Sequence, residues 1–182
     1  MGALPRFLRG RRRDVRVVLP LHRGIDRVRH GLAPTAESVT VAVADTLYTG
    51  RIWEGRIAGD VPVYFVECAA FFDREDIYAG PHGDYPDNPL RFIFFCRAAL
   101  ETAKAMEFRP DIVHAHDMQT GLIPAFLRTT YRVDAWFNHT RSCSLSTISL
   151  TRGYTRGKYT ALPGWGPPNS LRKPPSSTAT SI

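Results

Sequence analysis

Stretches with the two-residue alternation of a β-strand and stretches with helical spacing follow one another through most of this chain. Strand patterns occupy VRVVL (15–19), VPVYFVEC (61–68) and DIVHAH (111–116), and apolar residues recur at helical spacing in 3–12 and 119–130. Strands that alternate with helices through short connections favour an open, mainly parallel α/β sheet with flanking helices. Ligands of such sheets bind at the carboxyl ends of the strands, so functional residues are expected at that edge.

Two other patterns complete the expected fold. SVTVAVADTL (38–47) and YTGRIWEGRI (48–57) both alternate, and together they predict a β-hairpin. Asp87 is a suitable N-cap residue, and with Pro89 in the first turn it predicts a helix that runs to about Met106.

Residues 149–182 differ in composition from everything before them. They are rich in Pro, Gly, Ser and Thr, and they contain five basic side chains and no acidic one. Such a segment cannot bury enough apolar surface to offset the entropy of ordering, so we expect a disordered tail. The preceding residues hold 19 basic and 17 acidic side chains, so most of the net charge of +7 comes from this tail.

Charge and hydropathy weigh against several classes of protein. Arg9–Arg13 is the one dense basic patch, and no aromatic residue interleaves it to stack bases. We therefore interpret it as the solvated end of a helix and expect no nucleic-acid partner.

No apolar run reaches the ~18 residues of a membrane span, and no apolar stretch follows the basic N-terminus as in a secretory signal. Cys68, Cys96 and Cys143 form no CxxC pair, which is typical of reduced thiols in a cytoplasmic protein.

His114, His116 and Asp117 gather where the strand pattern DIVHAH ends and the next helical pattern begins. Three interpretations are open. Two histidines on one face of a strand could be metal ligands, a reading that needs further ligands from later strands. Alternatively, a histidine satisfies backbone groups at the sheet edge while Asp117 caps the following helix. In the third interpretation, Asp117 accepts hydrogen bonds from sugar hydroxyls, with a helix N-terminus behind it that favours anionic groups.

The stretch RPDIVHAHDMQTGLIPAFLR (109–128) closely resembles the strand–turn–helix of bacterial glycogen synthases and plant starch synthases, whose pattern reads PDIVHAHDWQTGLIPAYL. GALPRFLRGRRRDVRVVLPLHRGI and FFDREDIYAGPHGDYPDNPLRFIFFCRAAL resemble other segments of that family in the same order, and the resemblance covers about residues 1–148. It implies a GT-B glycosyltransferase of two Rossmann-like domains, with an incomplete N-terminal domain in residues 1–148. The family is a retaining glucosyltransferase that moves glucose from ADP-glucose to the non-reducing end of an α-1,4-glucan.

The resemblance also implies roles for single residues. Asp117 corresponds to the aspartate that contacts the donor glucose, with His116 and His114 as its neighbours in the turn. Met118 stands where the family has a tryptophan on the acceptor side, and a methionine lacks the flat face on which a sugar ring stacks. Tyr78 matches an aromatic residue near the acceptor path and is equally explained as a loop tyrosine with a solvated hydroxyl. The implied ligands are ADP-glucose and α-1,4-glucan, with no metal and no other cofactor.

Parts of the family's active site have no counterpart in this sequence. The family opens with a strand and the loop KTGGLADVVGALP beside the donor diphosphate, whereas this chain begins at MGALP. Thr147 and Ile148 match the residues TI of a family motif. After this motif the family continues with an active-site histidine and with a second domain, which supplies the catalytic glutamate and the cations that bind the diphosphate. When the tail is translated back into codons and the reading frame is moved one nucleotide earlier, permitted codon choices give a sequence similar to that continuation. We therefore interpret residues 149–182 as the product of a frameshift. We expect a truncated, inactive fragment; the alternative is a non-enzymatic remnant or a weak glucan-binding module.

Overall fold

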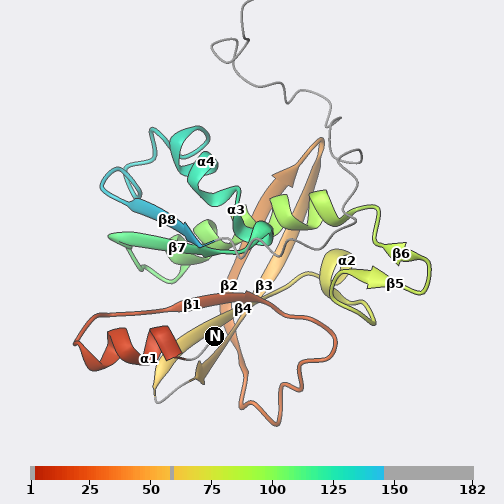
Figure 1. Cartoon of the computed structure of the whole chain (residues 1–182), viewed down its shortest axis with the longest axis horizontal. Helices are drawn as coiled ribbons and strands as arrows, with labels where there is room; N and C mark the ends of the chain where they lie inside the picture. Colours follow the sequence, from red (N-terminus) through yellow and green to blue (C-terminus); the bar gives the residue numbers. More distant parts are fainter. Residues whose placement is uncertain (1–2, 58–59, 146–182) are drawn as a thin grey trace, which may run out of the picture. The chain divides into compact units, whose positions relative to one another are not determined.

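The computed structural model describes residues 3–57 and 60–145 (Figure 1). The expected disorder and frameshift of residues 149–182 lie outside the described residues. The helices and strands follow in this order: α1 (Ala3–Gly10), β1 (Val17–Pro20), β2 (Ala33–Val43), β3 (Thr46–Ile57), β4 (Val61–Glu67), α2 (Ala69–Phe72), β5 (Ala79–Gly80), β6 (Gly83–Asp84), α3 (Asn88–Ala105), β7 (Ile112–His116), the 3-10 turn η1 (Met118–Thr120), α4 (Ile123–Arg128) and β8 (Arg141–Leu145).

The main sheet contains both parallel and antiparallel pairs. Its strands lie in the order β1-β4-β3-β2, with β1 parallel to β4 and the other two pairs antiparallel. β7 and β8 form a separate parallel pair. The α/β class expected from the sequence is confirmed, with parallel pairing in β1-β4 and β7-β8. The sheet is mixed rather than mainly parallel, because the β2–β3 hairpin adds two antiparallel pairs to the main sheet.

The predicted hairpin is confirmed, with its turn earlier than expected. β2 pairs with β3 up to Val43 opposite Thr46, so the turn consists of Ala44 and Asp45. Ala44 has a positive φ of 51°, which is the conformation that tight hairpin turns require. The alternating pattern continues through this turn, and for that reason periodicity alone placed the boundary too late.

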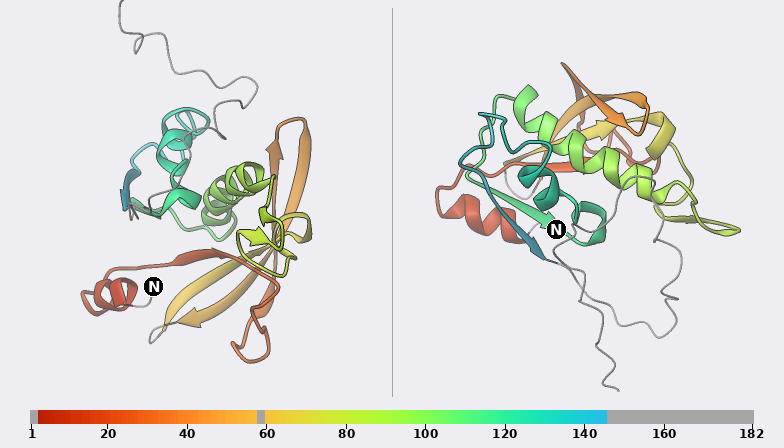
Figure 2. Two further views of the ribbon diagram at one scale, coloured as in Figure 1. Left: turned by 45° about the vertical axis from the view of Figure 1, so that its right-hand side comes forward. Right: turned by 90° about the horizontal axis from the view of Figure 1, so that it is seen from above.

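Helix α3 joins the two sheets through opposite faces. Phe94 and Ala98 are fully buried against the main sheet, in a cluster that includes the rings of Phe71 and Phe72. Cys96 and Leu100, on the other side of the helix, pack with Ala115 of β7, with α4 and with the segment after it. Figure 2 shows α3 between the β2–β3 hairpin and α4. A helix with two buried faces needs apolar residues beyond a single stripe, which its sequence supplies.

The start of α3 agrees with the prediction in position but not in mechanism. Asp87 occupies the N-cap position and Pro89 lies in the first turn, but the Asp87 carboxylate makes no capping hydrogen bond. It accepts hydrogen bonds from Arg74 at 3.1 and 2.6 Å instead. The charged, bidentate partner outcompetes the backbone N–H groups for this carboxylate.

β1 and β7 are both edge strands. β1 pairs only with β4, and β7 only with β8, among the strands of the described residues. All four residues of β1 are half-buried, whereas Ile112 at the start of β7 is 64% exposed. The parallel strands are therefore divided between two sheets, and α3 packs against both.

Candidate functional site

The end of β7 brings the two predicted histidines together. Ala115 is buried against α3, so its neighbours His114 and His116 share the opposite face of the strand. Their ring centroids lie 4.2 Å apart, and His114 is exposed while His116 is half-buried. The i, i+2 spacing on a strand thus produces the paired imidazoles that the sequence suggested.

Asp117 follows this pair in an unusual backbone conformation. Its φ of 58° and ψ of −176° fall in a region that is essentially restricted to glycine. Asp117 occupies the N-cap position of η1, as the capping interpretation expects, but its carboxylate makes no capping hydrogen bond there. The turn is held by the Thr120 hydroxyl, which donates to the carbonyl of His116 at 2.5 Å, and by the Cys96 thiol, which donates to the carbonyl of Gln119 at 3.2 Å.

The two acceptor-side candidates lie in different segments. Met118 is in the turn itself and is 59% exposed. Tyr78 precedes α3, is 46% exposed, and packs edge-on against Phe92 with centroids 6.5 Å apart. Its backbone carbonyl accepts a hydrogen bond from the side chain of Asn88 at 2.8 Å. Both side chains therefore present a large apolar surface to solvent.

A metal interpretation of the histidine pair finds no further support. Across residues 3–57 and 60–145, no group of three or more His, Cys, Asp or Glu side chains is arranged to hold a metal ion. The chemistry available at the turn is hydrogen bonding, since a carboxylate accepts from hydroxyl groups and a neutral imidazole both donates and accepts.

The structure adds a histidine that was not among the sequence candidates. His22 lies just beyond β1, in a hollow of about 490 Å³ that is also lined by Leu21, Arg23, Cys68 and Asp73. Its Nδ1 is buried and has no hydrogen-bond partner among the described residues. This hollow opens at the carboxyl ends of the parallel strands β1 and β4. The position of His22 two residues after the strand VVLP was the signal in the sequence.

Two histidines make the stability of the fold depend on pH. Burial, followed by the charge of Arg91, lowers the pKa of His22, and burial, followed by the charge of His114, lowers the pKa of His116. Because the unfolded chain keeps the ordinary pKa of 6.5, it binds more protons than the folded chain as the pH falls below that value. The free energy of unfolding should therefore decrease between about pH 7 and about pH 5.5, while most carboxylates are still ionised.

Urea denaturation at the two pH values measures this decrease. A variant with His22→Gln and His116→Gln should show a weaker pH dependence over the same range. An unfolding free energy that stays constant or rises on acidification would contradict the assignment of both histidines.

The comparison with known protein families decides the identity. The sequence model of the starch synthase catalytic domain matches residues 1–148. The chain belongs to this family.

Glycogen synthases of other bacteria align over most of this chain. Glycogen synthase 2 of Geobacter sulfurreducens is 44% identical over 139 residues, and the glycogen synthase of Geotalea uraniireducens is 41% identical over 139 residues. Each alignment covers 76% of this chain and 28% of the relative. The chain thus spans a little over a quarter of the length of these enzymes.

A solved structure shows the same fold. The catalytic domain of starch synthase IV from Arabidopsis thaliana, bound to ADP and acarbose, superposes with a TM-score of 0.69 at 28% sequence identity. The match covers 79% of this chain and 28% of that chain. This member of the starch synthase family has the mixed α/β architecture of that GT-B catalytic domain, and within its described residues no helix is long and apolar enough to cross a membrane.

Proposed function

We propose that this chain carries the donor-glucose side of a glucosyltransferase that moves glucose from ADP-glucose to the non-reducing end of an α-1,4-glucan. Family membership supports the reaction class, and the backbone of Asp117 supports the site. A non-glycine residue in its conformation costs roughly 1–3 kcal/mol, and such strain gathers where a binding geometry has to be held. The strain falls at the carboxyl end of a parallel strand, where α/β sheets bind their ligands.

Each residue of the turn has a role in this proposal. The Asp117 carboxylate accepts hydrogen bonds from hydroxyls of the donor glucose. His116, whose pKa burial holds below its ordinary value, is uncharged at neutral pH and adds one donor and one acceptor. The Thr120–His116 hydrogen bond fixes the turn, so these groups need little reorganisation when the sugar binds.

The acceptor glucan is assigned to Met118 and Tyr78. Both are exposed, and an aromatic ring such as Tyr78 offers a flat apolar face to a sugar. Met118 gives softer apolar contact without that face, so we expect weaker glucan binding than a tryptophan would give at this position.

Domain organisation, location and cofactors complete the proposal. Residues 1–148 form part of the N-terminal Rossmann-like domain, and the diphosphate-binding cations and catalytic glutamate come from the second domain of the family. Cys68, Cys96 and Cys143 are free thiols, which supports a reducing, cytoplasmic location. No metal and no nucleic acid takes part in the proposed reaction.

A chimera tests the proposal. Residues 3–145 would replace the aligned segment of the Geobacter sulfurreducens enzyme, and glucosyl transfer to glycogen would be measured. In an active chimera, Asp117→Ala should lower kcat/KM by about 100-fold or more, because a preorganised partner of the reacting sugar is lost. Asp45→Ala removes an exposed carboxylate from the β2–β3 turn and serves as the matched control. Met118→Trp should mainly lower KM for glycogen.

An Asp117→Ala chimera with the kcat/KM of the Asp45→Ala control would overturn the assignment. The soluble amount and melting temperature of each chimera would be compared first, so that a folding defect is recognised as such.

A further inference from the structure

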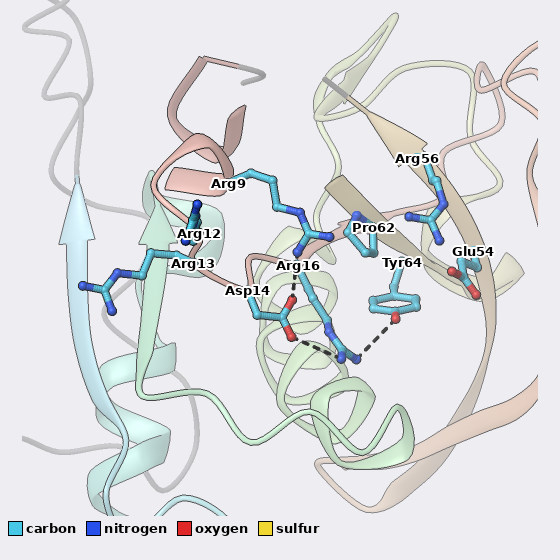
Figure 3. A pocket seen from close by; sticks show the side chains of 9 residues that line it. All are labelled: Arg9, Arg12, Arg13, Asp14, Arg16, Glu54, Arg56, Pro62 and Tyr64. Atoms are coloured by element: carbon cyan, nitrogen blue, oxygen red, sulfur yellow. Dashed lines mark hydrogen bonds and ion pairs between the residues drawn. The ribbon is translucent and has the colours of Figure 1, made fainter. Parts of the chain in front are cut away.

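Five arginines line a hollow of about 610 Å³ at the amino ends of β1 and β4 (Figure 3). We call it the arginine hollow; its arginines are Arg9, Arg12, Arg13, Arg16 and Arg56. They come from the end of α1, the segment before β1, and the end of β3. The hollow belongs to the main sheet, whereas Asp117 follows β7 of the separate β7-β8 pair.

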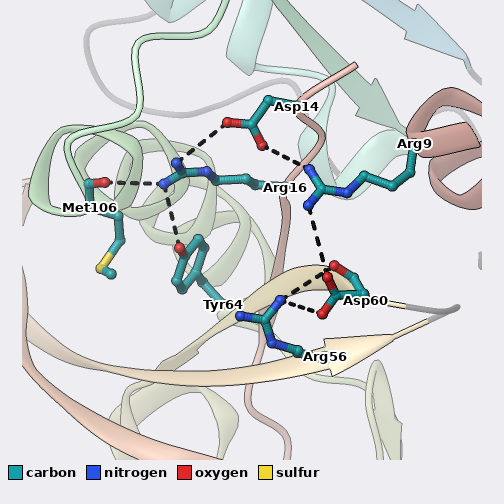
Figure 4. A network of polar contacts seen from close by, with 7 residues as sticks. All are labelled: Arg9, Asp14, Arg16, Arg56, Asp60, Tyr64 and Met106. Atoms are coloured by element: carbon teal, nitrogen blue, oxygen red, sulfur yellow. Dashed lines mark hydrogen bonds and ion pairs between the residues drawn. The ribbon is translucent and has the colours of Figure 1, made fainter. Parts of the chain in front are cut away.

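Two aspartates hold three of these guanidinium groups in place (Figure 4). Asp14 pairs with Arg9 and Arg16, both at 3.5 Å. Asp60 pairs with Arg56 at 2.6 Å and with Arg9 at 3.9 Å. Arg9 therefore links the two aspartates, and the network is ordered before any ligand arrives.

Arg16 is anchored from the other side as well. Its guanidinium donates to the carbonyl of Met106 at 3.2 Å, at the end of α3, and to the hydroxyl of Tyr64 at 3.5 Å. Because the Tyr64 hydroxyl accepts this hydrogen bond, its own hydrogen is available to another acceptor. The buried base of the hollow thus offers a donor beside the guanidinium of Arg16.

Two arginines remain without ion-pair partners. The side chains of Arg12 and Arg13 make no hydrogen bond or ion pair within the part of the chain that the structure describes, and Figure 3 shows Arg13 extending away from Asp14. Arg12 has a φ of 58° just after α1, a position that glycine would occupy with less strain. The described lining of the hollow holds these five arginines but only two acidic residues, Asp14 and Glu54, with Asp60 adjacent, which leaves a local excess of positive charge.

We propose that the arginine hollow binds a small molecule that carries a phosphate or diphosphate group. Guanidinium groups match phosphate oxygens through paired hydrogen bonds, and several of them from different elements can surround one such group. The size of the hollow suits a compact ligand. The lining contains no exposed aromatic platform on which successive bases could stack, which argues against a nucleic-acid strand.

Calorimetric titration of the full chain with inorganic pyrophosphate tests this proposal. At fixed ionic strength, saturable binding is expected, with sulfate binding more weakly. A variant with Arg9→Ala and Arg12→Gly should bind pyrophosphate about tenfold more weakly or worse, since it loses charge-assisted hydrogen bonds. Arg29→Ala with Arg132→Ala removes the same charge from exposed sites elsewhere and should leave the affinity unchanged.

Both substitutions in the hollow should keep the fold. Arg12→Gly relieves a positive φ, and the ion pairs of Arg9 are long and partly exposed, so melting temperatures in the absence of ligand should stay close to that of the original chain. Pyrophosphate should raise the melting temperature of the original chain and the control by mass action, and should raise that of the Arg9/Arg12 variant by a smaller amount at the same concentration.

Three results would overturn the proposal: no saturable binding of pyrophosphate, an equal loss of affinity in the Arg29/Arg132 control, or tighter binding of single-stranded RNA with the same dependence on Arg9 and Arg12. None of these measurements uses glucosyl transfer, so they stand apart from the test of Asp117.

Discussion

The 182-residue chain, purified on its own, is expected to transfer no measurable glucose from ADP-glucose to glycogen. The chain spans 28% of its glycogen synthase relatives. In our proposal the turn at Asp117 supplies hydrogen bonds to the donor sugar, and the family resemblance implies that the cations for the departing diphosphate come from the second domain. Loss of one preorganised electrostatic group typically lowers the rate by about 100- to 1000-fold, and the family resemblance implies that several are supplied elsewhere.

Incorporation of labelled glucose into glycogen measures this directly. The active chimera, assayed at the same concentration, shows that the substrates and conditions are adequate. Transfer by the isolated chain that disappears in Asp117→Ala would prove the expectation wrong and would place the whole reaction within these residues.

The second large effect is expected for Phe94→Ala. Phe94 is completely buried and contacts the rings of Tyr48, Phe71 and Phe72 at centroid distances of 6.3, 5.1 and 6.0 Å. Removing such a ring usually lowers the free energy of unfolding by about 3–5 kcal/mol. That is a large part of the stability of an ordinary domain, about 5–15 kcal/mol, so we expect the variant to be largely unfolded or to melt at a much lower temperature.

Urea denaturation followed by circular dichroism provides the measurement. Phe7→Ala is the matched control, because Phe7 is 58% exposed on α1, a helix without buried residues. Its change should stay within about 0.5 kcal/mol. Equal effects of the two substitutions would show that the ring cluster around Phe94 is not the core of the main sheet.

Much of this fold could be predicted because its patterns are local. Alternation within 38–57 predicted the hairpin, and the apolar run of 111–116 predicted β7 with both histidines at its end. The interaction of Asp87 could not be predicted in the same way, since its partner Arg74 lies in a loop with no regular pattern. The positive φ of Asp117 has no signature in the sequence either, because the residue that adopts it is not a glycine.

The arginine hollow shows a second limit of sequence patterns. From sequence alone, Arg9–Arg13 indicates a solvated helix end, which is the usual meaning of a short basic run. The structure adds Arg16, Arg56 and the hydroxyl of Tyr64 to that run, and the last two are more than forty positions away in sequence from Arg9. Only long-range pairing of β1 with β4 and of β4 with β3 brings these groups together.

The two buried faces of α3 determine how the described part of the chain should lose its structure. Phe94 and Ala98 close the cluster on the main sheet, and Cys96 and Leu100 close the cluster under β7. Melting of this one helix would open both clusters at once, so the two sheets should unfold in a single cooperative transition rather than one after the other. Backbone amides of β4 and β7 should accordingly exchange with solvent through the same global opening, and a protease that cuts within α3 should leave neither half folded.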